Sequence, residues 1–208
     1  YTSIETFRSE LSQLDIETLL EAPSYCKEDE TQGIVRDTSR RVLGDPEDRL
    51  AQYGKLRRAT HLAAQDCDVI HIQTPFAAHY AGLHAARRLG KPVIATYHTL
   101  FEEYLQHYIP WLPAAGLRSL ARHFSRGQCN ALDAVIVPSS AMRERLLEYG
   151  VTQPLHVLPT GLPASAFTPG DASDFRNRHG IAPDQPVALF VGRVAHEKNI
   201  GFLLQAIS

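Results

Sequence analysis

A histidine stands where a predicted buried strand gives way to a predicted helix. Residues 93–96 form an apolar, partly β-branched run with the composition of a strand that is buried on both faces. His98 follows this run, and apolar residues recur at helical spacing over residues 101–108. Ligands bind at the carboxyl ends of strands in open α/β sheets. Two interpretations stay open: a functional group at the mouth of an interdomain crevice, or a half-buried histidine with a hydrogen-bond partner.

Small and polar residues also follow neighbouring predicted strands. If the sheet is parallel, these strand ends face the same crevice. The candidates for this cleft are Thr74, Thr99, Thr160 and Gly161. Ordinary turn and cap chemistry is the alternative for each of them. We favour that alternative for Ser139 and Ser140, because they stand directly before a predicted helix.

Two cations lie close to a predicted helix start near the end of the chain. The segment GRVAHEKN, residues 192–199, follows an apolar run and precedes that helix. Arg193 and Lys198, together with the N–H groups of a helix N-terminus, would suit a diphosphate. Glu197 lies beside them and is a further candidate for the cleft. Two solvated surface cations are the alternative interpretation.

Arginines recur at four-residue steps on a predicted helix within residues 113–132. Arg118, Arg122 and Arg126 form this basic stripe, apolar residues lie beside it, and Trp111 precedes it. A basic amphipathic helix with an aromatic anchor is typical of a segment that lies on a membrane or contacts a lipid acceptor. The alternative, which the pattern favours slightly, is a helix packed on the sheet with a solvated basic face.

Other common catalytic patterns find little support. His98 and Glu102 are four residues apart, as are Glu103 and His107, but the two pairs fall on different helix faces without a third ligand. We therefore expect no metal. The sequence contains no G-x-S-x-G elbow, no P-loop and no G-x-G-x-x-G fingerprint.

Alternating strands and helices would position these residues. A parallel, doubly wound, Rossmann-like α/β sheet follows from this alternation. The predicted strands cover residues 16–20, 33–36, 68–72, 93–96, 133–138, 155–158 and 187–192. The predicted helices begin near residues 2, 46, 75, 101, 113, 140, 172 and 199. We predict a first domain at 1–165, a linker at 166–185 and the start of a second domain at 186–208.

Composition excludes several classes of protein. The chain has 208 residues and a formal net charge of −2, so no global basic field attracts nucleic acid. No apolar run approaches the roughly 18 residues of a membrane span. Cys26, Cys67 and Cys129 are few and widely spaced, as in a protein with reduced thiols. We expect a cytoplasmic protein, with the inner face of the membrane as a further location if the basic helix contacts lipid.

Taken together, these segments resemble one enzyme family. FVGRVAHEKN resembles the G-R-x-x-x-E-K-N signature of the retaining family 4 (group 1) glycosyltransferases, which have the two-domain GT-B fold. DAVIVPSSAMRERL and HVLPTGLPASAFTPGD resemble the segments that precede that signature. DVIHIQTPFAAHYAG and PVIATYHTLFEEYLQHY resemble the versions in glycolipid-forming members, the diacylglycerol glucosyltransferases and their relatives.

The resemblance implies roles for individual residues. His98 would lie beside the transferred sugar, and Arg193 and Lys198 would hold the donor diphosphate. The implied donor is a nucleotide-sugar such as a UDP- or GDP-hexose, and the acceptor a lipid or a saccharide, without a cofactor or a metal. The family's glycine-rich first loop and its acidic E-x7-E motif are absent from these residues, so we expect the 208 residues to be a truncated, inactive part of a transferase.

Two other functions stay open on the sequence. One is a non-catalytic two-domain α/β module that binds a ligand. The other is a UDP-sugar epimerase of the same fold, against which the G-R-x-x-x-E-K-N signature argues.

Overall fold

A computed structural model describes most of the chain. The described residues are 2–24, 33–37, 39–42, 45–98, 100, 114–168, 170–192, 194 and 198–207. The chain divides into two compact units, Tyr1–Pro163 and Ala164–Ser208. The predicted helix over 101–108 lies outside the described residues.

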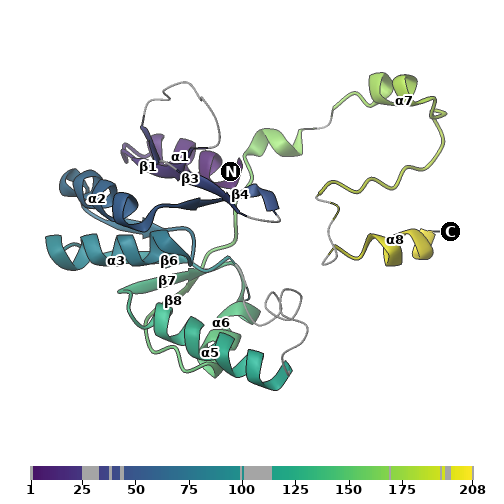
Figure 1. Ribbon diagram of the computed structural model, residues 1–208. Helices are drawn as coiled ribbons and strands as arrows, with labels where there is room; N and C mark the ends of the chain where they lie inside the picture. Colours follow the sequence, from purple (N-terminus) through teal and green to yellow (C-terminus); the bar gives the residue numbers. More distant parts are fainter. Residues whose placement is uncertain are drawn as a thin grey trace. The chain divides into compact units, whose positions relative to one another are not determined.

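A parallel sheet forms the centre of the first unit (Figure 1). Its strands are β5 (Ile70–Ile72), β6 (Val93–Thr96), β7 (Ala134–Val137) and β8 (Leu155–Val157), hydrogen-bonded in that order. Branched apolar residues dominate these segments and suit the pleated surface of a buried sheet. The register sets Ile72 beside Ala95, and Ala95 beside Val135. The predicted parallel α/β architecture is therefore confirmed.

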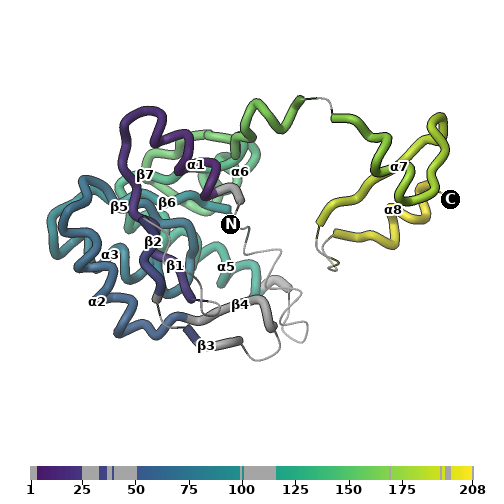
Figure 2. Tube along the Cα trace, turned by 90° about the horizontal axis from the view of Figure 1, so that it is seen from above, coloured from purple at the N-terminus to yellow at the C-terminus, as the bar shows by residue number. Residues whose placement is uncertain are grey.

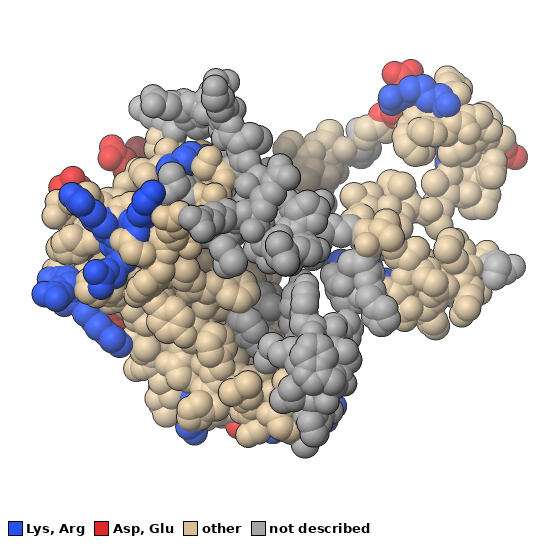
Figure 3. All heavy atoms as spheres, viewed as in Figure 1, with Lys and Arg blue, Asp and Glu red and all other residues tan. Residues whose placement is uncertain are grey.

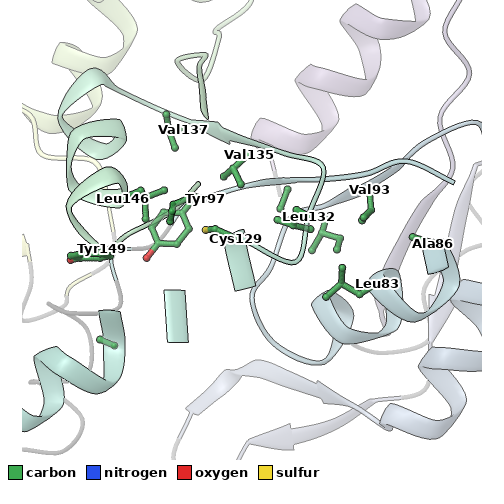
Figure 4. Packing of buried hydrophobic residues seen from close by; sticks show 14 residues of the cluster. Leu83, Ala86, Val93, Tyr97, Cys129, Leu132, Val135, Val137, Leu146 and Tyr149 are labelled. Carbon is green, nitrogen blue, oxygen red and sulfur yellow. The ribbon is translucent and has the colours of Figure 1, made fainter. Parts of the chain in front are cut away.

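Helices from the connections cover one face of this sheet. They are α3 (Ala77–Leu89), α5 (Ala114–Cys129) and α6 (Ser140–Glu148). Successive strands are added in one direction, and right-handed crossovers then place the connecting helices on the same face. Figure 4 shows the resulting core, in which Leu83 of α3, Leu146 of α6 and the strand residues Val93 and Val135 belong to one buried cluster.

Local signals set the ends of these helices. Ser139 has an extended backbone, and its hydroxyl accepts a hydrogen bond from the Met142 N–H at 3.2 Å, so it caps α6 as predicted. Gly90 and Gly150 follow α3 and α6 with φ of 65° and 84°, a conformation that glycine adopts without a steric penalty.

Helix α1 (Thr2–Ser12) contacts the opposite face of the sheet. Side chains alternate between faces along a strand, so His71, Ile94 and Thr96 point away from the core cluster. The Phe7 ring of α1 meets the His71 ring edge-on, with centroids 5.8 Å apart. Helices therefore lie on both faces.

The remaining elements of the first unit flank this sheet. Strands β1 (Leu20–Pro23) and β2 (Ile34–Asp37) pair in parallel, and the Arg8 side chain donates to the Gly33 carbonyl at 3.1 Å. Helix α2 (Tyr53–Ala63) lies beside α3 (Figure 2) and is followed by a short 3-10 turn, η1 (Ala64–Asp66).

Two predicted elements of the first unit begin too early. The helix predicted from Pro46 is present as α2, but it begins only at Tyr53, and the residues before it form β4 (Asp45–Ala51), which pairs antiparallel with β3 (Ser39–Val42). The fixed φ of proline suits either a first helical turn or an edge strand, so Pro46 does not decide between them. The strand predicted at 16–20 begins at Leu20, because its partner strand β2 pairs only with residues 20–23.

The second unit contains η2 (Ala164–Phe167), α7 (Ser173–His179) and α8 (Ile200–Ile207). Arg176 ties α7 to the following segment by donating to the carbonyls of Ala182 and Gln185, at 2.7 and 2.9 Å. The strand predicted at 187–192 is wrong: this segment is irregular, and Val191 is 83% exposed. A strand needs a neighbour for its backbone hydrogen bonds, and the described residues of this unit supply none.

Candidate functional site

A pocket opens at the carboxyl ends of β5 and β6. Its polar lining comes from the segment after β5, the end of β6, the start of α3 and the last turns of α5. The polar lining residues are Gln73, Thr74, His79, Thr96, His98 and Gln128. Core residues such as Ile72, Ala95 and Val135 form its floor. The pocket therefore combines an apolar base with several hydrogen-bonding groups.

His98 follows Tyr97 at the end of β6, which is flanked by β5 and β7 in the sheet. Its side chain is exposed, and Nε2 lies 2.8 Å from Oε1 of Gln73. Partial burial lowers the pKa of His98, because desolvation disfavours the charged imidazolium. The structure therefore brings this residue to a strand-end pocket as a hydrogen-bonded imidazole that is biased toward its neutral form.

A second histidine, His71, lies close to His98, and the sequence pattern did not single it out. His71 Nε2 lies 2.7 Å from Thr96 Oγ1 and 3.0 Å from Gln73 Nε2. Burial, with the nearby His98 as a smaller cause, lowers the pKa of His71 to about 4. A polar residue between Ile70 and Ile72 was the available signal, because it must face the side of the strand opposite to the core.

Buried polar groups support the other side of the pocket. The Gln128 amide donates to the Pro75 carbonyl at 2.6 Å, and Tyr97 and Ser125 share a hydrogen bond of 2.8 Å between their hydroxyls. His79 is only 3% exposed, its Nε2 has no hydrogen-bond partner among the described residues, and burial lowers its pKa to about 4. Sequence periodicity did not single out any of these residues.

The other predicted cleft residues divide between the pocket and the rest of the surface. Thr74 is half-buried and lines the pocket. Thr160 and Gly161 follow β8, are exposed and do not line it. Thr99 lies outside the described residues.

The predicted diphosphate site falls in the second unit and is described only in part. Lys198 is exposed and precedes α8, and Asn199 between them has a φ of 45°. Arg193 and Glu197 lie outside the described residues. The geometry of the proposed cation pair therefore remains a prediction.

Helix α5 packs on the core through one stripe and exposes its arginines on the other. Leu117 and Ala121 are buried, while Arg118, Arg122 and Arg126 are exposed. The Arg122 guanidinium lies over the Tyr149 ring, 5.5 Å from its centroid. The predicted anchor Trp111 lies outside the described residues. Helix α5 therefore packs on the core and has exposed arginines on its outer face.

Within the described part of the chain, no group of three or more His, Cys, Asp and Glu side chains is placed to hold a metal ion. The same part contains no helix with the length and apolar character of a membrane span.

The family model for Glycosyltransferase Family 4 matches residues 2–165. The chain belongs to this family. It is 34% identical over 170 residues to the alpha-monoglucosyldiacylglycerol synthase of Streptococcus pneumoniae. The aligned region covers 77% of this chain and 37% of that protein. It is also 33% identical over 135 residues to a GDP-mannose-dependent alpha-mannosyltransferase of Mycobacterium tuberculosis. That aligned region covers 65% of this chain and 34% of that protein.

The chain thus spans about a third of the length of these curated relatives. Among solved structures, the crystal structure of Anabaena Alr3699/HepE in complex with UDP matches 71% of this chain and 36% of that chain. The TM-score is 0.47 at 18% sequence identity.

Proposed function

We propose that the protein is a retaining glycosyltransferase that moves a sugar from a nucleotide-sugar to an acceptor. The observation that carries this proposal is the pocket with His98 at the carboxyl end of β6, inside a domain of Glycosyltransferase Family 4. In this proposal the imidazole contacts the transferred sugar, and Thr74 and Gln73 line the same space. A neutral imidazole can accept a hydrogen bond from a sugar hydroxyl, and the lowered pKa of His98 favours that form.

The leaving nucleotide diphosphate needs positive charge more than it needs a base. We assign this task to Arg193 and Lys198, because cations aimed at a charge that develops in the transition state are a large source of catalysis. In this scheme residues 1–165 form the acceptor-side domain, 166–185 the linker and 186–208 the start of the donor domain.

A lipid is the acceptor that we favour. The support is the likeness to a protein named alpha-monoglucosyldiacylglycerol synthase, together with exposed cations that suit an anionic membrane surface. Figure 3 shows Lys and Arg side chains gathered over α2 and α3. The exposed members are Lys55, Arg57, Arg58, Arg87 and Arg88. We place the protein at the cytoplasmic face of a membrane on this basis.

A donor screen on the full-length protein tests the proposal. UDP- and GDP-hexoses are supplied with diacylglycerol, monoglucosyldiacylglycerol or a soluble saccharide, and the released nucleotide and the anomeric form of the product are measured. We expect acceptor-dependent release from one donor, with the product in the donor's own anomeric configuration. Donor binding without release would favour the non-catalytic module, and an epimerised sugar would favour the epimerase.

The same assay measures the role of His98. His98→Ala should lower turnover by roughly a hundredfold or more, the usual effect of losing a positioned catalytic imidazole. His156→Ala is the matched control, because His156 lies in the same sheet, is exposed and does not line the pocket. Turnover of His98→Ala close to that of the control would remove His98 from the site.

A further inference from the structure

A continuous chain of side-chain hydrogen bonds leads to His98 from the strand beside it. Thr96 Oγ1 lies 2.7 Å from His71 Nε2, that nitrogen lies 3.0 Å from Gln73 Nε2, and Gln73 Oε1 lies 2.8 Å from His98 Nε2. His71 belongs to β5 and Thr96 to β6, so this series of hydrogen bonds links two neighbouring strands. These three contacts have the distances of ordinary hydrogen bonds.

The chemistry of the Gln73 amide determines which groups donate and which accept in this series of hydrogen bonds. Its oxygen can only accept, so His98 must donate from Nε2. Its nitrogen can only donate, and it lies 3.0 Å from Nε2 and 3.4 Å from Nδ1 of His71, so the neutral His71 ring meets it as an acceptor at whichever nitrogen lacks the proton. The Thr96 hydroxyl can donate to Nε2 of His71. The amide therefore requires His98 to donate through Nε2 and meets His71 as an acceptor.

The His71 ring is held on several sides. Phe7 packs edge-on against it, with an interplanar angle of 81°, and Thr96 holds its Nε2. Its pKa of about 4 keeps His71 neutral near pH 7, so the ring carries a single ring proton and retains an acceptor nitrogen. His71 is thus a fixed acceptor against which the amide of Gln73 can be oriented.

We propose that Gln73 and His71 are positioning residues that hold His98 in the tautomer protonated at Nε2, so that its Nδ1 accepts a hydrogen bond from a substrate hydroxyl. Among the described residues, Gln73 is the hydrogen-bond partner of His98, and Nδ1 has none. The inference rests on the proposed function, which places His98 beside the transferred sugar. Gln73 acts through His98 and need not touch the substrate.

Substitutions at Gln73 separate this role from a purely structural one. Gln73→Met keeps the length of the side chain but removes both hydrogen bonds, and should lower kcat about tenfold with little change in the KM for the donor. Gln73→Glu still accepts from His98 and should stay within about threefold of wild type when assayed near pH 8.5, where a carboxylate neighbour leaves a histidine mostly neutral. Gln65→Met, at an exposed position outside the network, is the matched control.

Long-range nitrogen–proton NMR of the histidines in the full-length protein reads the tautomers directly. We expect wild-type His98 to carry its proton on Nε2. In Gln73→Glu His98 should keep that proton on Nε2, because the carboxylate still accepts from it. A wild-type His98 protonated at Nδ1 would overturn the inference, as would a Gln73→Met variant with the kcat of the control.

The two proposals can fail separately. If His98→Ala retains full turnover, the role of His98 in the proposed function fails. The NMR spectra of the wild-type protein still decide which nitrogen of His98 carries the proton. If His98→Ala is inactive while Gln73→Met is fully active, only the positioning role is refuted. A Gln73→Met variant that does not fold leaves the wild-type spectra and Gln73→Glu as the deciding measurements.

Discussion

Buried histidines are the residues that link this site to pH. Burial lowers the pKa values of both His71 and His79 to about 4, against an ordinary value of 6.5, because the folded protein solvates the charged ring poorly. The unfolded chain therefore takes up protons on these residues as the pH falls below about 6.5, while the folded chain does so only near 4. Their contribution to stability is present above pH 6.5 and is lost between 6.5 and 4.

A substitution at His79 tests this linkage. His79→Leu removes a buried ring whose Nε2 has no partner among the described residues, so stability at pH 7 should change little. Near pH 4.5 the variant should be more stable than wild type by roughly 1–3 kcal/mol, because it lacks the proton uptake of the unfolded state. Urea unfolding at a series of pH values measures the difference. The exposed His123→Leu variant is the control, and equal pH slopes for His79→Leu and wild type would contradict the linkage.

At the scale of elements, a single side chain sets the start of the helix that follows β7. Ser139 supplies an acceptor to the Met142 N–H, one of the donors that lack an intrahelical partner in the first turn. Ser140 is the first residue of α6 itself, and its side chain is exposed. Two adjacent serines therefore differ in role, although the sequence presents them as equivalent.

Paired alanine substitutions should reveal this difference. Ser139→Ala should lower the free energy of unfolding by about 1 kcal/mol, because the Met142 N–H loses its partner. Ser140→Ala should change it by less than about 0.5 kcal/mol, as is usual for exposed surface positions. Chemical denaturation of both variants gives the two values. A loss at Ser140 equal to that at Ser139 would show that the cap is not the source of the effect.

At the scale of the whole molecule, two exposed basic faces are candidates for membrane contact. One is the outer face of α5 with Arg118 and Arg126, and the other lies over α2 and α3 with Arg57 and Arg88. The pKa of His84 is lowered by desolvation and then by Arg57 of α2 and Arg88 of α3, so cations from both helices lie close enough to act on one side chain. That second face was not predicted from sequence, because its cations come from separate helices.

Vesicle co-sedimentation distinguishes these faces. Binding should rise with the fraction of anionic lipid and fall with salt, since each basic residue near the surface contributes about 1 kcal/mol. Double substitution to glutamine at Arg57 and Arg88 should weaken binding by roughly tenfold or more if α2 and α3 face the membrane. The same change at Arg118 and Arg126 tests α5.

A double substitution on α6 is the control for an effect of lost charge alone. Arg143 and Arg145 are exposed on α6, and their replacement by glutamine removes the same net charge. Equal binding to neutral and anionic vesicles, or equal weakening by all three double variants, would refute a defined electrostatic face.

Features that depend on neighbours in the sequence could be predicted. Apolar runs indicated β6 and β7, serine at a helix start indicated the cap of α6, and the end of the apolar run before residue 98 indicated a histidine at a strand end. Each of these signals acts over a few residues, through side-chain burial or a local hydrogen bond. The succession of such segments also indicated the family.

Features that depend on distant partners were decided by the tertiary structure. The hairpin of β3 and β4 forms around Pro46, which is compatible with helix or strand, and the segment at 187–192 is irregular although its apolar run suits a strand. The hydrogen bonds among His71, Gln73 and His98 join residues up to 25 positions apart. Strand pairing and the hydrogen bonds of a buried imidazole depend on groups that folding brings together from distant parts of the sequence. Local periodicity therefore does not predict them.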